Sequence, residues 1–291
     1  MAAFPTISII VIAHNEADKL ERCLGSLVRQ QYPSFEIIVI DAKSTDSSAI
    51  IAKKYTSKVF RVDLNVIGYS RQLGVDLSSG SIVAVIDPDT VFPSNDLLLE
   101  VVNAFAHREN TAIVWLKNIG PDNSKIARCF FYFWEEFARH RINNSPNVTL
   151  GANSFYLKSA IVEVGGFNKK LNYVSDTDLT QRILQNNYSC LLLEKPIIHH
   201  TNTSLREFTR KQLWGARDFV EYGSERLGMT HRNAVYELFV LGTKSMVKTV
   251  GERKDLSGFI LPLMLTIRGA SYAIFYLRKL LSPKKHVKEF Y

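Results

Sequence analysis

Cysteine is scarce in this chain, whose 291 residues contain only Cys23, Cys129 and Cys190. An odd number of widely separated cysteines, with no Cys-x-x-Cys pair, argues against a disulfide framework and against a thiolate zinc site. Each cysteine lies in an apolar stretch, which predicts free, buried thiols in a reducing compartment. Low-complexity tracts and internal repeats are also absent, and 46% of the residues are hydrophobic. This composition excludes a disordered protein.

The N-terminal region has no basic segment followed by a cleavable apolar one. Its first apolar run, residues 7–12, is only as long as a strand, so we expect no secretion signal.

The chain contains 36 Lys and Arg residues but only 28 Asp and Glu residues, which gives a net charge of +8. This excess predicts either ordinary solubility or an anionic partner, such as a nucleotide diphosphate, nucleic acid or an acidic membrane face. Because no recognisable nucleic-acid-binding motif accompanies the charge, we expect no nucleic-acid partner.

Short β-branched runs alternate with helical patterns in the first part of the chain, which predicts βαβ units, a parallel sheet and one large α/β domain. Ligands of such sheets bind outside the carboxyl ends of the strands. Asn15 is expected to cap the first helix. The expected strands span residues 7–12, 36–40, 58–62, 82–86, 112–116, 153–157 and 190–193. The expected helices span residues 17–28, 46–55, 68–77, 95–106, 125–139 and 176–185, and the fifth is rich in aromatic residues.

Asp87 and Asp89 follow the fully apolar strand 82–86. Such a pair of carboxylates can hold Mg²⁺ or Mn²⁺ with positions left open for the oxygens of a diphosphate. The alternative is a strand-ending turn with a capping aspartate.

The adjacent residues His199 and His200 follow another strand. Because neighbours on a strand point to opposite faces, at most one should complete a metal site, and we favour His199.

Asp176 and Asp178 open a helix about 90 residues further on. One of them can act as a general base toward an acceptor hydroxyl, and capping of the helix is the alternative. Arg71 lies in another predicted helix, where it either neutralises a diphosphate or belongs to a solvated face. One carboxylate set for a cation and another for a base predict a metal-dependent transfer enzyme.

After residue 204 the alternation of strands and helices ends, and basic, amphipathic and apolar helical patterns follow one another. A basic helix follows, which we expect to be a solvated face, with contact to phosphate or lipid as the alternative; its cations are Arg206, Arg210, Lys211 and Arg217. Residues 234–250 form an amphipathic pattern, and residues 143–147 a polar loop.

Residues 256–277 are long enough to span a membrane but contain Arg268 at their centre. A central charge costs about 2.5–3.5 kcal/mol on insertion, which favours an interfacial or hairpin segment with basic flanks on anionic lipid. The alternative is a buried helix pair or a dimer contact. We expect a catalytic domain at 1–220 and a membrane-associating helical region at 221–291.

Several segments together resemble family 2 glycosyltransferases, in the right order over roughly residues 5–220. Three belong to the opening of that family, one to its metal motif and two to its acceptor side. They are Ile9–Glu16, Cys23–Gln30, Glu36–Asp46, Ile86–Asp89, Gly165–Phe167 and Ser175–Leu179 with Arg182. The resemblance implies a GT-A fold, which is α/β and Rossmann-like with a mostly parallel central sheet, followed here by C-terminal amphipathic and apolar helices. It also implies a UDP- or GDP-linked sugar donor, inversion by single displacement, and Mn²⁺ or Mg²⁺.

By the same resemblance, each candidate residue receives a role. Asp176 would be the general base, and Asp87, Asp89 and His199 would hold the metal. The donor-binding set would comprise Asn15, Glu16, Asp41, Arg71 and Asp87, with Asp41 at the nucleoside and Arg71 at the diphosphate. A lipid-linked acceptor at the cytoplasmic face of the membrane follows from the apolar tail, its basic flanks and the aromatic helix.

The chain departs from the family pattern at positions that bear on which donor it uses and how many sugars it adds. Ala42 stands where a second aspartate is usual, which leaves the identity of the donor open, and Ser175 stands where glutamate is usual. The Gln-x-x-Arg-Trp motif of processive members is reduced to Gln212-Leu-Trp214, which favours the addition of one sugar. Two alternatives remain at this point, a nucleotidyltransferase and a catalytically inactive scaffold of the same fold.

Overall fold

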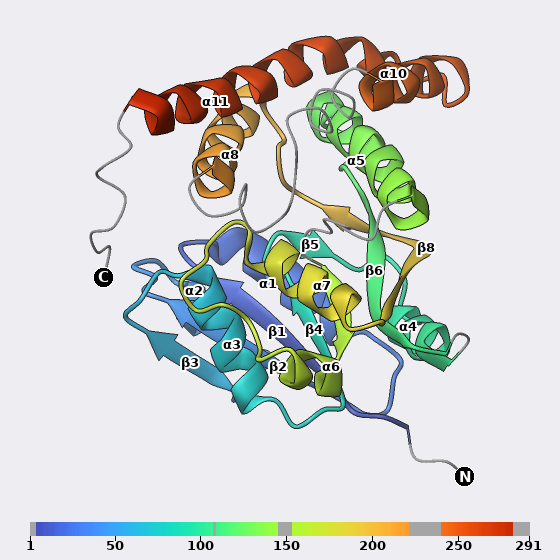
Figure 1. Cartoon of the computed structure of the whole chain (residues 1–291). Coiled ribbons are helices and arrows are strands. Elements are labelled where there is room, and N and C mark those ends of the chain that lie inside the picture. The colour runs from blue at the N-terminus through green and yellow to red at the C-terminus, as the bar shows by residue number, and fades with distance from the viewer. Residues whose placement is uncertain (1–3, 107–108, 145–152, 221–239, 282–291) are drawn as a thin grey trace.

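The computed structural model describes residues 4–106, 109–144, 153–220 and 240–281 (Figure 1). Its centre is an eight-stranded sheet in the order β3-β2-β1-β4-β7-β6-β8-β5. The strands are β1 (Ile7–Ala13), β2 (Phe35–Ala42), β3 (Val59–Val62), β4 (Ile82–Ile86), β5 (Thr90–Val91), β6 (Thr111–Ile119), β7 (Ser154–Leu157) and β8 (Ser189–His199).

The first four strands confirm the predicted parallel arrangement. β1 pairs in parallel with both β2 and β4, and β2 with β3. β7 is inserted antiparallel between β4 and β6, while β6 and β8 are again parallel. The short strand β5 pairs antiparallel with β8 at the far edge. The sheet is therefore mixed and mostly parallel, as expected for a GT-A fold.

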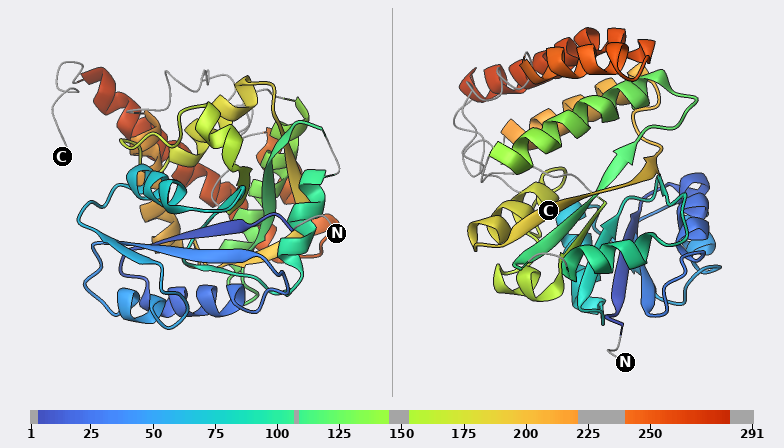
Figure 2. Two further views of the ribbon diagram at one scale, coloured as in Figure 1. Left: turned by 90° about the horizontal axis from the view of Figure 1, so that it is seen from below. Right: turned by 90° about the vertical axis from the view of Figure 1, so that its right-hand side faces the viewer.

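Helices cover both faces of the sheet (Figure 2). On one face, α1 (Ala17–Leu27) and α4 (Leu97–Ala106) bury leucines against β1 and β4. On the other face lie α3 (Ile67–Leu77), α6 (Lys158–Glu163) and α7 (Ser175–Gln185). Burial of apolar side chains on both faces explains why the central strands are continuous apolar runs rather than alternating ones. Helix α2 (Ser48–Ala52) follows β2.

A separate helical layer lies above the carboxyl ends of the strands (Figure 1). It consists of α5 (Lys125–Asn144), α8 (Leu205–Asp218), α10 (Gly242–Gly251), the short 3₁₀ helix η3 (Leu256–Ile260) and α11 (Leu261–Leu281). A third apolar cluster joins Phe133 of α5, Phe208 of α8 and Met264 of α11. Residues 256–279 form one helical stretch that is long and apolar enough to cross a membrane.

Some local predictions were wrong. Asn15 does not cap α1, because its Oδ1 accepts hydrogen bonds from the backbone N–H and hydroxyl of Thr45, in the loop after β2. The helix predicted over 46–55 is α2, only five residues long. β8 extends beyond the predicted 190–193, through Pro196 to His199. Most of the predicted loop at 143–147 and part of the amphipathic helix at 234–250 lie outside the described residues.

Candidate active site

Three potential metal ligands converge at the edge of the sheet. Asp87 follows β4, Asp89 precedes β5, and His199 is the last residue of β8. Pairing of β5 with β8 sets Thr90 opposite His199, which brings the imidazole to the two carboxylates. His199 Nε2 lies 2.8 Å from Asp89 Oδ1 and 3.4 Å from Asp87 Oδ2. One ligand atom from each residue lies within 4.8 Å of the others.

The donor set of this group fits a divalent cation. Carboxylate oxygens suit Mg²⁺ and Mn²⁺ alike, and the imidazole nitrogen favours Mn²⁺ over Mg²⁺. Burial raises the pKa of Asp87 despite the opposing charge of His199. Burial acts in the same direction on Asp89, but the charge and hydrogen bond of His199, aided by Lys211, hold the pKa of Asp89 below its usual range. At neutral pH Asp89 is therefore an anionic carboxylate, the form that can bind a cation.

Two buried asparagines hold the group in place. Asn153 Oδ1 accepts hydrogen bonds from the Asp87 backbone N–H, at 2.9 Å, and the Thr90 hydroxyl, at 3.0 Å. Its Nδ2 donates to Asn118 Oδ1 at 2.9 Å and lies 3.3 Å from His199 Nδ1. Asn118 Oδ1 also lies 3.1 Å from His199 Nδ1. Asn153 has a φ of 66°, a left-handed conformation that asparagine tolerates better than most residues.

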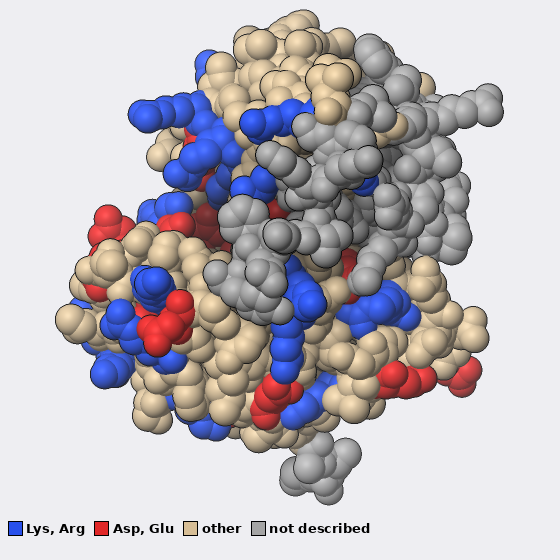
Figure 3. Space-filling model, turned by 60° about the vertical axis from the view of Figure 1, so that its left-hand side comes forward, with Lys and Arg blue, Asp and Glu red and all other residues tan. Residues whose placement is uncertain are grey.

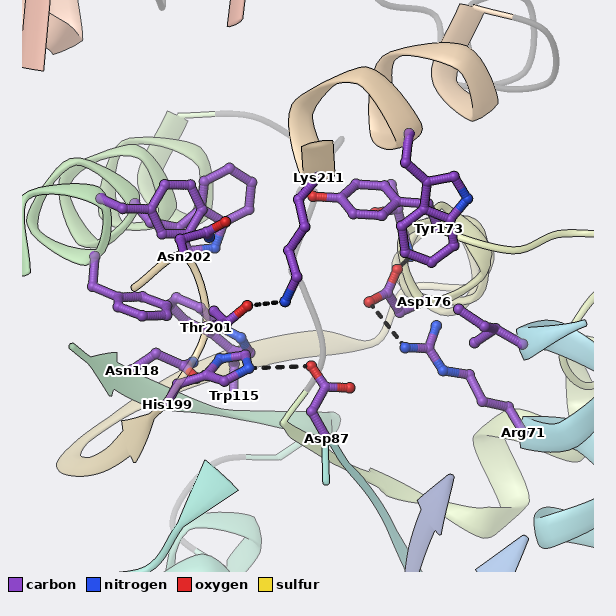
Figure 4. Close-up of a pocket in the computed structure, with 16 residues that line it drawn as sticks. Arg71, Asp87, Trp115, Asn118, Tyr173, Asp176, His199, Thr201, Asn202 and Lys211 are labelled. Atoms are coloured by element: carbon purple, nitrogen blue, oxygen red, sulfur yellow. Dashed lines mark hydrogen bonds and ion pairs between the residues drawn. The ribbon is translucent and has the colours of Figure 1, made fainter. Parts of the chain in front are cut away.

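A pocket of about 210 Å³ adjoins this group (Figure 4). Asp87 and His199 line it on one side, and Arg71 and Asp176 on the other. Asp176 comes from the first turn of α7, and Arg71 from the middle of α3, so the pocket joins segments far apart in the sequence. The remaining lining residues come mostly from β6, α5, the loop before α7 and the segment around α8: Ile67, Trp115, Asn118, Phe130, Phe131, Trp134, Tyr173, Thr177, Thr201, Asn202, Lys211 and Trp214.

Arg71 and Asp176 interact within the pocket. The Arg71 guanidinium lies 3.5 Å from Asp176 Oδ2 and donates to the Ser175 hydroxyl at 2.6 Å. Arg71 is buried, so the solvated helix face considered for it is wrong. Burial raises the pKa of Asp176, and the positive charge of Arg71 opposes that rise. Asp176 is thus a carboxylate with increased basicity at a pocket wall, which suits a proton acceptor.

Asp178 has a different environment from Asp176. It forms an ion pair with Arg182 at 2.7 Å, one turn further along α7. Arg182 in turn donates to the carbonyls of Val164 and Gly166, in the turn where Gly165 and Gly166 both adopt positive φ. Asp178 therefore stabilises the turn before α7, which leaves Asp176 as the carboxylate of this pair that faces the pocket.

Three predicted donor-binding residues lie at the ends of β1 and β2, outside the pocket lining. Asn15 and Glu16 follow β1, and the Glu16 side chain pairs with Lys19 at 3.1 Å. Asp41 is fully buried, and its Oδ1 accepts the Ser44 N–H at 3.3 Å. Among the described residues its Oδ2 has no hydrogen-bond partner. The structure thus brings Asp87, Asp89, His199, Arg71 and Asp176 together but does not place these three with them.

Three further pocket residues were not predicted to belong to the site: Lys211 and Trp214 were noted only in the basic helix and the motif remnant, and Tyr173 was not noted. Lys211 of α8 lies 3.8 Å from Asp89 Oδ2, and its ammonium donates to the Thr201 hydroxyl. Tyr173 and Trp214 meet edge-to-face, with ring centroids 5.4 Å apart. The signal for Lys211 was present in the basic pattern of its helix, but that pattern does not distinguish a pocket lysine from a solvated one.

The fold agrees with comparisons to known proteins. The sequence profile described as glycosyl transferase family 2 matches residues 8–165, more than half of the chain. The chain belongs to glycosyl transferase family 2. It is similar to glycosyltransferase AglE of Haloferax volcanii, at 24% identity over 72% of each chain. It is also similar to the beta-monoglucosyldiacylglycerol synthase of a Nostoc species, at 26% identity over 76% of this chain but only 50% of that one.

Solved structures show the same fold. The mannosyltransferase PcManGT of Pyrobaculum calidifontis, solved in complex with GDP-Man and Mn²⁺, superposes with a TM-score of 0.65 and 16% identity, covering 98% of this chain and 89% of the other. Glucosyl-3-phosphoglycerate synthase of Mycobacterium tuberculosis, with Mg²⁺ and UDP, gives a TM-score of 0.58 and 18% identity, covering 78% and 80%. The family 2 chain described here therefore has a GT-A fold.

Proposed function

We propose that this family 2 glycosyltransferase is a metal-dependent, inverting enzyme. It moves one sugar from a UDP- or GDP-linked donor to a hydroxyl or phosphate of its acceptor. The observation that carries this proposal is the pocket itself, where Asp87 and His199 on one side face Arg71 and Asp176 on the other. These two elements suit a single displacement by a hydroxyl, because a cation at the acidic group would stabilise the leaving diphosphate and the buried carboxylate would accept the proton.

Asp176 is assigned the role of general base. Its carboxylate takes the proton from an acceptor hydroxyl as that oxygen attacks the anomeric carbon. The bond from that carbon to the diphosphate breaks, and its electron pair leaves with the nucleoside diphosphate. Because attack and departure occur on opposite faces of the sugar, the configuration is inverted. A phosphate acceptor is already deprotonated at neutral pH, so its attack does not require Asp176 to accept a proton.

The leaving group requires positive charge on the opposite wall. A divalent cation held by Asp87, Asp89 and His199 would supply Lewis-acid stabilisation of the diphosphate. Lys211 Nζ lies beside this candidate cation site, 3.8 Å from Asp89 Oδ2, and we assign it a contact with the diphosphate oxygens. We assign Arg71 primarily to orienting Asp176, since its guanidinium already contacts that carboxylate and Ser175.

We further propose a lipid-linked acceptor at the cytoplasmic face of the membrane. A relative is named for the synthesis of a glucosyldiacylglycerol, and another, of Salmonella anatum, as an O-antigen chain rhamnosyltransferase. The aromatic side chains of α5 and α8 at the pocket suit an acceptor with an apolar part. In this proposal residues 1–220 form the catalytic domain, and residues 221–291 form the membrane-associating region.

The reaction class is tested by identifying the released product. Purified protein is incubated with UDP- and GDP-sugars, a membrane lipid extract and Mn²⁺, and the products are resolved by mass spectrometry. We expect a nucleoside diphosphate. Pyrophosphate would instead support a nucleotidyltransferase, and nucleotide binding without turnover of any donor would support an inactive scaffold.

Two variants test the residue roles. Asp176→Asn should lower transfer to a hydroxyl acceptor by about 10²–10⁴-fold, while the thermal stabilisation by nucleotide with Mn²⁺ remains. Asp89→Ala should remove that Mn²⁺-dependent stabilisation. Asp76→Asn, at an exposed carboxylate of α3 that accepts a hydrogen bond from Gln72, serves as the control. Full transfer by Asp176→Asn would refute the base, and unchanged metal-dependent binding by Asp89→Ala would refute the metal ligand.

A further inference from the structure

The outermost helix carries an exposed apolar stripe along its whole length. On η3 and α11, exposed side chains recur at Phe259, Leu263, Ile274, Leu277 and Leu281, with exposed fractions between 48% and 82%. At about 100° per residue, the four of these positions on α11 fall within an arc of about 60°, and Phe259 precedes them on η3. Thr266 and Ala270 lie within or beside the same arc and are exposed too. We call these seven residues the outer stripe.

The one charge in the middle of α11 points away from this stripe. Arg268 lies about 180° around the helix from Leu277 by the same helical geometry. Its guanidinium donates to Gln212 Oε1 of α8 at 2.9 Å and lies over the rings of Trp134 and Tyr272. The polarity of α11 is therefore inverted relative to a surface helix of a soluble protein, because its charge faces the protein and its apolar side faces outward.

Packing attaches α11 along the protein rather than leaving it free to cross a bilayer. Leu261 and Met264 are buried in the cluster that contains Phe133 and Phe208. With its 21 residues, α11 measures about 30 Å, the thickness of a bilayer core. A perpendicular insertion would have to break the Arg268–Gln212 contact and expose this cluster. The docked position of α11 instead suits a helix that lies parallel to a membrane plane.

Basic residues border the outer stripe. Residues 242–281 contain seven Lys and Arg but only two acidic residues. Lys244 and Lys254 are exposed before the stripe, and Arg278 near its end. Figure 3 shows the upper part of the molecule as a largely uncharged surface with Lys and Arg side chains gathered below it. An apolar stripe with cations at its border is complementary to a bilayer that contains anionic lipid.

We propose that the outer stripe inserts into the interface of an anionic membrane, with α11 lying flat and Arg268 fixed on the protein side. Helix α8 then connects the membrane to the pocket, because Gln212 contacts Arg268 while Lys211 and Trp214, on the same helix, line the pocket. This inference rests on the membrane-associating region of the proposed function and assigns the surface that binds. Lipid binding can be measured without any sugar donor, so its failure and that of the proposed transfer reaction are distinguishable.

The first test measures binding of the full chain to sedimenting vesicles. We expect binding to phosphatidylcholine vesicles that contain phosphatidylglycerol, and a weakening when salt is raised. The double variant Leu263→Glu with Leu277→Glu should bind about tenfold more weakly or less, since two charges would enter the apolar region. Val162→Glu, at a 64% exposed valine on α6, is the matched control and should bind normally. Thermal unfolding verifies that each variant folds.

The second test distinguishes a flat helix from a spanning one. Single cysteines are introduced as Phe259→Cys, Ala270→Cys and Leu281→Cys, labelled with one fluorophore, and quenched by lipids brominated at different depths. The native Cys23 and Cys129 are buried, and the unsubstituted chain gives the background. A flat helix places all three labels at one shallow depth. A deep label at Ala270 between two shallow ones would overturn the proposal.

A second copy of the chain is the competing occupant of the outer stripe. Equal vesicle binding by the double variant and the unsubstituted chain would overturn membrane docking through this face. A dimer in sedimentation velocity that the double variant converts to a monomer, without vesicle binding by either, would overturn it in favour of self-association.

Discussion

Arg71 and Asp176 form a buried ion pair, with 3.5 Å between a guanidinium nitrogen and Asp176 Oδ2. The resemblance to family 2 suggested separate roles for these residues, one at the diphosphate and one at the acceptor. In the structure they are electrostatically coupled, because Arg71 opposes the rise in the pKa of Asp176 that burial causes. A change at Arg71 should therefore be measurable in the protonation of the base.

Replacement of Arg71 should shift the pH dependence of transfer. In Arg71→Gln the opposing charge is lost while burial remains, so the pKa of Asp176 rises further. Because the base acts only when deprotonated, the acid limb of kcat/KM for a hydroxyl acceptor should move to higher pH. Arg71→Lys keeps the charge and should move the limb less. An acid limb at the same pH in all three proteins would contradict the assignment of Asp176.

Asn118 should control the affinity of the metal site. A cation requires the lone pair of His199 Nε2, so the ring proton must sit on Nδ1, where Asn118 Oδ1 can accept it at 3.1 Å. With the proton on Nε2, Nδ1 can instead accept from Asn153 Nδ2 at 3.3 Å. The two asparagines thus satisfy both ring forms.

Substitution Asn118→Leu removes the acceptor for Nδ1–H and should weaken Mn²⁺ binding by about 10–100-fold in calorimetry. Asn118→Asp retains an acceptor and should keep the affinity within a few-fold. Asn186→Leu, at an amide that contacts Glu163 on the surface, is the control for loss of an asparagine. Equal Mn²⁺ affinities for Asn118→Leu and the unsubstituted chain would show that Asn118 does not orient His199.

Lys211 should act on the donor rather than on the acceptor. Its ammonium is 3.8 Å from Asp89 Oδ2, beside the place assigned to the diphosphate. Lys211→Met should raise the KM for the nucleotide sugar by about tenfold, corresponding to one lost charge-assisted contact of about 1.4 kcal/mol. Arg210→Met removes an exposed cation from the same helix and should leave that KM unchanged. Equal effects of both variants would reduce the role of Lys211 to general charge.

Glu36 should make the stability of the sheet depend on pH. Although burial opposes its ionisation, hydrogen bonds from Lys58, Ser8 and Ser79 lower the pKa of Glu36 from 4.5 to about 2. A lowered folded-state pKa stabilises the protein above the unfolded value, and this contribution is lost as pH falls from about 4.5 toward 2.

Glu36→Gln should therefore lose about 2 kcal/mol of unfolding free energy at pH 7, and the difference should shrink as the pH approaches 2. Urea titrations across this range provide the measurement. Glu21→Gln, which breaks an exposed ion pair with Lys54, should change the stability by less than about 1 kcal/mol. A Glu36→Gln deficit that persists undiminished at the lowest pH would contradict the electrostatic origin.

The sequence was sufficient for the first half of the fold because its signals there are local. Strands β1 to β4 are β-branched runs separated by helical patterns, and each was expected close to its observed bounds. The insertion of β7 between β4 and β6 depends on pairings between distant segments, which periodicity does not encode. The wrong cap at Asn15 has a similar cause, because a contact with Thr45 from another loop replaced a local hydrogen bond.

The candidate site was predictable where residue type and position coincide. Asp87, Asp89 and Asp176 are acidic residues at strand and helix ends, and the ending of β8 at His199 supports the choice of His199 over His200. Lys211 was not separable from its basic neighbours, since helical periodicity gives the direction of a side chain but not what lies opposite. The burial of Arg71 likewise depends on the packing of α3 near α7, which no local pattern specifies.

The pairing of β5 with β8 has a consequence for how the chain completes its candidate metal site. The family profile ends at residue 165, yet the imidazole beside Asp89 is 34 positions beyond that limit. A fragment cut at the family boundary would keep both carboxylates but would have no strand to bring the third ligand. During synthesis, too, more than a hundred residues must be added after Asp87 and Asp89 before β8 exists to pair with β5 and bring His199 beside them.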